Sequence, residues 1–151
     1  MKNKSELFSQ LWQESRIRFS NQLINITEKD LKKKLDPSPN RIGFLIRHIG
    51  DVELLFAKNV FGGSDVKVIA KTVIAQYDTG EWTNLKELNE YVDYSFKILK
   101  YIIEKQKESD WEIEISTKEF GVKTKAEALG RIISHTAYHA GQIAIIKKYG
   151  N

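Results

Sequence analysis

The chain contains no cysteine among its 151 residues. This absence excludes a disulfide-stabilised scaffold, a thiolate metal site and a cysteine nucleophile, and it fits a reducing compartment. The polar start, Met1 to Glu6, is followed by no uninterrupted apolar stretch of the kind a secretory signal needs. No run approaches the ~20 apolar residues of a membrane span. We therefore expect a cytoplasmic protein that does not insert into membranes.

Chain-breaking residues are also scarce, with two prolines and nine glycines. Few breakers favour long helices over many short strands. Apolar residues make up 41% and charged residues 29%, which is ordinary for a globular protein. A chain of this length has room for one domain, so we expect residues 1–151 to form a single one.

The excess of basic charge is small, at +4. A dedicated nucleic-acid-binding domain usually carries a stronger basic surface. The longest basic cluster, Lys32 to Lys34, contains no aromatic residue on which a base could stack. We therefore expect this cluster to be a solvated helix face, and we expect no nucleic-acid partner.

Hydrophobic periodicity predicts four long helices. Apolar residues recur at steps of three and four in residues 5–25, 40–61, 84–108 and from 125 to about 149. Ser5 is a candidate cap for the first helix, and Thr124 with Glu127 forms a capping box for the last. Helices of this length in one small domain pack side by side. The predicted fold is all-α, a four-helix bundle.

The connecting segments are expected to differ in kind. Residues 27–35 suggest a short helix, and 36–40 are the clearest breaker in the chain. Residues 64–82 carry β-branched side chains without alternation, so we expect a long crossover connection with room for a short helix. Strict alternation over 111–116 predicts a strand, paired with 120–122 in a minor β-hairpin before the last helix.

Histidine is rare, and the placement of its three copies is informative. His135 and His139 are four residues apart, so on a helix their side chains share one face, with Cβ atoms ~5–6 Å apart. That face also carries Ile132 and Ile143, which indicates a core face. His48 lies on the apolar stripe of the second helix.

Two imidazoles at this spacing can bind one divalent cation, and a third from a neighbouring helix would complete a three-histidine site. Three neutral ligands do not neutralise the charge of the cation, and they leave coordination positions open for water or substrate. Both features are typical of a catalytic metal rather than a structural one. Such a site suits zinc, nickel, iron and copper. The alternative is that the histidines are hydrogen-bonded packing residues in a plain helical interaction module.

Two polar residues near the histidines are candidate catalytic neighbours. Gln142, three residues beyond His139, could orient a metal-bound water or a substrate group, or it could be a buried amide bonded to the bundle. Asp51, three residues beyond His48, could hold a histidine ring or a water. We favour a solvated charge at the helix edge for Asp51. Glu53 points away from the His48 face and is expected to be structural.

A resemblance to the DinB superfamily (DinB/YfiT-like proteins) is carried by two segments, Arg47–Glu53 (RHIGDVE) and His135–Ile143 (HTAYHAGQI). Their order, spacing and helix placement match the family over nearly the whole chain. The resemblance implies a four-helix bundle with a long crossover. It also implies a divalent metal, often zinc or nickel, held by three histidines that here would be His48, His135 and His139. Many members are homodimers.

Relatives in that family include thiol S-transferases that use bacillithiol or mycothiol, thiol-dependent isomerases and metal-dependent hydrolases. A shared bundle does not fix the reaction. We expect a metalloenzyme that activates a thiol or water against a small-molecule substrate. Thiol transfer is favoured because Thr136 stands where His-Glu-x-x-His proteases carry their glutamate base. The alternative is a non-catalytic metal-binding or stress-response protein. Acidification through ~6.5 is expected to release the metal.

Overall fold

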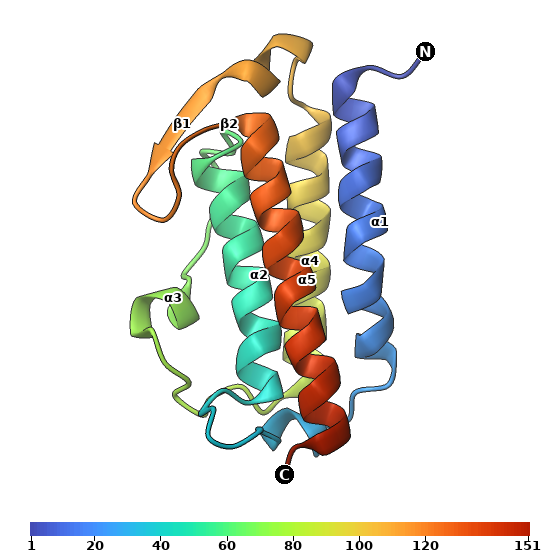
Figure 1. The fold of residues 1–151 in the computed structure, drawn as a ribbon, viewed down its shortest axis with the longest axis vertical. Helices are drawn as coiled ribbons and strands as arrows, with labels where there is room; N and C mark the ends of the chain where they lie inside the picture. The colour runs from blue at the N-terminus through green and yellow to red at the C-terminus, as the bar shows by residue number, and fades with distance from the viewer.

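Four long helices packed side by side dominate the computed structural model, which describes residues 1–151 (Figure 1). They are α1 (Lys4–Ile24), α2 (Ile42–Asn59), α4 (Leu85–Glu104) and α5 (Lys125–Tyr149). The predicted all-α bundle is therefore confirmed. None of these helices is both long enough and apolar enough to cross a membrane.

The path of the chain through the bundle requires a long connection. Helices α1 and α5 run toward the end where the C-terminus lies, and α2 and α4 run the opposite way (Figure 1). The α2 and α4 ends meet, since the Gln106 side chain donates to the carbonyl of Phe61. Residues 60–84 return the chain to the start of α4. They carry the short helix α3 (Lys71–Ala75), which lies outside the bundle beside α2, so the predicted crossover with its short helix is confirmed.

The start of α1 differs from the prediction. Asn3 is the cap, and its side chain accepts from the Glu6 amide in a capping box. Ser5 lies inside the helix, where its buried hydroxyl donates to the Gln106 carbonyl and accepts from the Trp111 indole. Both residue types cap helices well. Ser5 is excluded as the cap because it satisfies two buried partners from another part of the chain.

Two connecting elements and the end of α4 differ from the prediction. The segment expected to be a helix over 27–35 contains only the 3-10 turn η1 (Asp30–Lys32), and α4 ends before a second 3-10 turn, η2 (Glu108–Glu112). The hairpin pairs β1 (Glu114–Thr117) with β2 (Gly121–Thr124) in antiparallel register. Its first strand begins later than expected because Trp111 belongs to η2 and packs against the Phe8 and Phe61 rings. The predicted capping box of α5 is confirmed.

The inward face of α1 is more polar than its sequence suggests. Leu7 and Leu11 belong to the apolar pattern of residues 5–25, which predicts a core-facing stripe, yet they are 48% and 56% exposed. Trp12 and Phe19 are buried instead, together with the charged side chain of Arg16. Polar residues occur on this face because they have buried partners.

Arg16 on α1 forms a buried ion pair with Glu53 on α2, at the centre of the bundle. Arg16 Nε donates to Glu53 Oε1 at 2.8 Å, and Arg16 Nη2 donates to the Val92 carbonyl. Ser95 Oγ donates to the other Glu53 oxygen. Burial raises the pKa of Glu53, and the Arg16 guanidinium partly offsets this. Glu53 therefore joins α1, α2 and α4, and it is structural, as expected from its position away from His48.

Candidate metal centre

The three histidines converge between two antiparallel helices. His48 comes from α2, and His135 and His139 come from α5. One ring nitrogen from each lies within 4.8 Å of the others. The ring centroids are 4.5 to 5.1 Å apart. The meeting of the single histidine with the pair, predicted from their separate helices, is confirmed.

The rings lie at the margin of the core rather than inside it. All three histidines are half-buried, which corrects the expectation of a core face. The Phe44 ring stacks on His48 at 5.8 Å, and the exposed Tyr138 ring meets His139 edge-on at 5.2 Å. The histidines are therefore packed against aromatic rings and remain partly exposed to solvent.

Hydrogen bonds orient two of the rings. His139 Nδ1 lies 2.6 Å from Gln142 Oε1. An amide oxygen only accepts, so Nδ1 carries the ring proton and Nε2 keeps its lone pair. His48 Nδ1 lies 3.0 Å from the hydroxyl of Thr72 on α3. The Nε2 atoms of His48 and His135 are 3.2 Å apart.

This donor set fits a divalent cation. Nitrogens bound to zinc at ~2.0–2.1 Å with tetrahedral angles lie about 3.3 Å apart, close to the separation of the His48 and His135 Nε2 atoms. The buried Nδ1 of His135 has no hydrogen-bond partner, and a cation bound through Nε2 would not supply one. The interpretation as ligands therefore rests on the convergence of the three ring nitrogens and on this spacing.

Burial keeps the three imidazoles neutral. It lowers the pKa of His48 to about 4, with a further contribution from His139. It lowers the pKa of His135 to about 3, helped by the neighbouring histidines and Arg131. Burial also lowers the pKa of His139, and the bond to Gln142 opposes this. Protons therefore compete for these nitrogens at lower pH than the ~6.5 expected from sequence.

Gln142 and Asp51, the two candidate neighbours of the histidines, differ in burial and in their contact with the rings. Gln142 is half-buried and bonds to His139, so its expected proximity to the site is found. Asp51 is fully buried, which makes the favoured interpretation as a solvated charge wrong. It reaches His48 only through the hydroxyl of Thr72.

Asp51 is buried because donors from three elements surround it. It accepts from Arg47 Nε at 2.8 Å, from the Tyr91 hydroxyl at 2.5 Å and from both the amide and the hydroxyl of Thr72. The guanidinium of Arg47 also lies 3.7 Å from the Tyr91 ring centroid. The i, i+4 spacing of Arg47 and Asp51 could have indicated this pair. Nothing in the sequence indicated Thr72 or Tyr91, which come from distant segments.

A small, mostly apolar cavity lies next to Gln142. Its volume is about 170 Å³, and its lining includes Leu45, Ile145 and Ile146, with Ser38 and Asn40 as polar residues and none of the three histidines. Leu45 precedes the α2 histidine by three residues, and Gln142 follows the second α5 histidine by three. The cavity is therefore within about one helical turn of the site, and it has room for a small apolar group.

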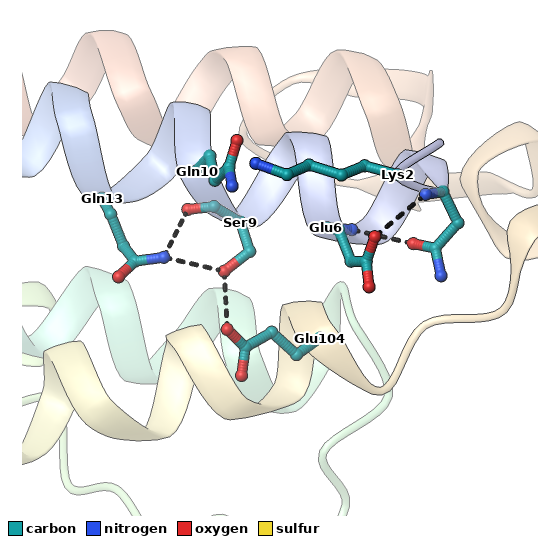
Figure 2. Close-up of a pocket in the computed structure, with 7 residues that line it drawn as sticks. Lys2, Glu6, Ser9, Gln10, Gln13 and Glu104 are labelled. Atoms are coloured by element: carbon teal, nitrogen blue, oxygen red, sulfur yellow. Dashed lines mark hydrogen bonds between the residues drawn. The ribbon is translucent and has the colours of Figure 1, made fainter.

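A larger hollow of about 540 Å³ lies elsewhere, on α1 and α4, and no apolar side chain lines it. Figure 2 shows that its polar groups bind one another: Ser9 donates to Glu104, and Gln13 donates to Ser9. It contains no histidine and no cluster of side chains aimed at one point. The three-histidine cluster is the better candidate for chemistry.

The sequence model of the DinB superfamily matches residues 8–143, a span that contains all three histidines. The chain belongs to the DinB superfamily. No curated protein and no solved structure matches it. Membership in the DinB superfamily agrees with the bundle, the long crossover and the histidine cluster described above.

Proposed function

We propose that this DinB-superfamily protein is a metal-dependent enzyme that activates a low-molecular-weight thiol, or water, for attack on a small molecule. The observation that carries the proposal is the convergence of three neutral imidazoles, two of them hydrogen-bonded at Nδ1. We propose zinc or nickel as the metal, since imidazole suits both.

The three histidines form an uncharged set of ligands that leaves coordination positions of the metal open. A divalent cation bound there would keep its full charge and lower the pKa of a thiol or water that occupies an open position. Gln142 accepts the Nδ1 proton of His139, which leaves the lone pair of Nε2 available to a cation. The apolar cavity beside Gln142 would take a small apolar group of the substrate.

Thiol transfer is favoured over hydrolysis because no free carboxylate base lies at the site. Asp51, the carboxylate closest to the ligands through hydrogen bonds, already accepts four of them. A thiol whose pKa a bound cation would lower needs no such base: its proton passes to solvent, its sulfur forms a bond to an electrophilic carbon, and the bond from that carbon to the leaving group breaks, with the electron pair departing on the leaving group. Hydrolysis is the second reaction to test.

The test begins with elemental analysis of the purified protein, where we expect one divalent metal per chain. The metal-loaded protein is then assayed for thiol transfer from bacillithiol, mycothiol or glutathione to a chloro-aromatic acceptor. We expect product formation that a chelator abolishes and added zinc or nickel restores. If the loaded protein transfers no thiol and hydrolyses no ester or amide, it is a non-catalytic metal-binding or stress-response protein.

Substitution of the ligands is the matched control. His135→Ala or His139→Ala should abolish stoichiometric metal while circular dichroism shows unchanged helix content. Loss of metal should also lower the melting temperature, because a ligand that binds only the folded state stabilises it. Metal retained in either variant would show that the ligands are wrongly assigned.

A further inference from the structure

The crossover contributes a residue that orients one of the proposed ligands, although no spacing in the sequence connects the two. Thr72 is 2% exposed and lies in the first turn of α3. Its hydroxyl lies between Asp51 Oδ2, at 2.7 Å, and His48 Nδ1, at 3.0 Å. The three groups form one chain, Asp51 to Thr72 to His48.

The direction of the protons in this chain follows from Asp51. Three further donors point at the carboxylate: the Arg47 guanidinium, the Tyr91 hydroxyl and the Thr72 amide. A group surrounded by donors in this way is an acceptor only, so the Thr72 hydroxyl donates its proton to it.

A hydroxyl has one proton, and that of Thr72 is used on Asp51. The Thr72 oxygen can therefore only accept from His48, which requires the ring proton to be on Nδ1. The lone pair of His48 is then on Nε2, the atom that lies 3.2 Å from His135 Nε2. This is the tautomer that a shared cation needs.

We propose that Thr72 is the positioning residue that fixes the tautomer and ring orientation of His48, so that the crossover segment prepares the metal site. The inference rests on the proposed metal binding. Partners of this kind typically change metal affinity by 10–100-fold when removed.

The test compares Thr72→Val, which keeps the shape and the backbone amide but removes the hydroxyl, with Thr72→Ser, which keeps the hydroxyl. Zinc affinity is measured by competition with a chromogenic chelator. We expect Thr72→Val to bind zinc about 10–100-fold more weakly and Thr72→Ser to remain close to the unmodified protein.

Thr136→Val is the matched control, because Thr136 is also a buried threonine, adjacent to His135, but its hydroxyl has no partner. It should leave zinc affinity unchanged. Equal losses in Thr136→Val and Thr72→Val would show a general packing effect and overturn the proposal, as would unchanged affinity in Thr72→Val or lost affinity in Thr72→Ser.

A second readout needs no metal. In the ¹⁵N spectrum of the metal-free protein, His48 should show a protonated Nδ1 and an unprotonated Nε2, and Thr72→Val should shift it toward a mixture of tautomers. The same tautomer in both proteins would overturn the proposal. If the unmodified protein binds no zinc, the proposed function fails, while this spectrum still decides the role of Thr72.

Discussion

The charge of the histidine side chains is the residue-scale property with the clearest consequence for stability. Burial lowers the pKa of His48 to about 4 and that of His135 to about 3, whereas in the unfolded chain both should titrate near ~6.5. Below ~6.5 the unfolded chain therefore binds protons that the folded, metal-free protein does not. Stability must then fall as pH falls through this window, and it is restored as pH rises.

We expect the metal-free protein, kept in chelator, to unfold at lower urea concentration at about pH 5.5 than at about pH 7. Most carboxylates remain ionised over this range, so histidine dominates the change. The variant His135→Gln should show a smaller pH dependence. Equal urea midpoints at the two pH values would mean that the histidines are not buried in the neutral form.

Apart from His48, whose meeting with the α5 pair was expected from its place on the apolar stripe of α2 and from the family resemblance, the site was predictable only where its geometry is local. His135 and His139 share a face through helical periodicity alone, and Gln142 follows by the same rule. Asp51 was misjudged because its position at a helix edge does not reveal that Tyr91 and Thr72 cover it. Such contacts depend on how separate segments dock, and the sequence carries no local signal for them.

At the scale of the elements, predictions succeeded where one face is continuously apolar. The stripes of α2, α4 and α5 are buried largely as expected, and the capping box at Thr124 fixes the start of α5. They failed at the start of α1, where Asn3 and Ser5 are both good caps and tertiary contacts decide between them. In the connecting segments the crossover with its short helix and the hairpin were found, but the helix expected over 27–35 is only a 3-10 turn, because so short a segment has no periodicity to read.

The packing of the crossover against α2 leads to a prediction about Gly43. A Cβ there would lie 1.9 Å from the backbone carbonyl oxygen of Trp82. The end of the crossover therefore packs directly against the backbone of α2, where no side chain intervenes. Gly43→Ala should therefore destabilise the protein by about 1–3 kcal/mol, as overpacking does. The measurement is urea-induced unfolding followed by circular dichroism.

Gly130→Ala is the control, since nothing lies within 4 Å of the added methyl group on α5. It should stabilise the protein by about 0.5–1 kcal/mol, because alanine loses less backbone freedom than glycine in a helix. If Gly43→Ala unfolded at the same urea concentration as the unmodified protein, the close contact with Trp82 would be disproved.

At the scale of the whole molecule, the exposed apolar face of α1 bears on oligomeric state. Leu7, Leu11 and Ile17 are exposed and line a hollow along this helix. The family resemblance implies a homodimer, and pairing of this face would bury side chains that the bundle leaves uncovered.

We expect light scattering to give twice the chain mass for the unmodified protein and the single-chain mass for Leu11→Glu. Val122→Glu, which changes an exposed apolar residue on the hairpin, should remain dimeric. If the unmodified protein proves to be monomeric, the homodimer prediction is wrong. A dimeric Leu11→Glu would place the interface on another face.

The two hydrogen bonds that orient the imidazoles have different origins in the chain. The bond from His139 to Gln142 spans three residues of one helix, so it is available as soon as α5 is helical. The bond from His48 to Thr72 spans 24 residues and requires the crossover to be in place. Alignment of His139 therefore needs only a helical α5, whereas alignment of His48 also needs the crossover to be docked against α2. Tight binding of a cation would then depend on the docked crossover, and a cleaved or misfolded crossover would weaken it.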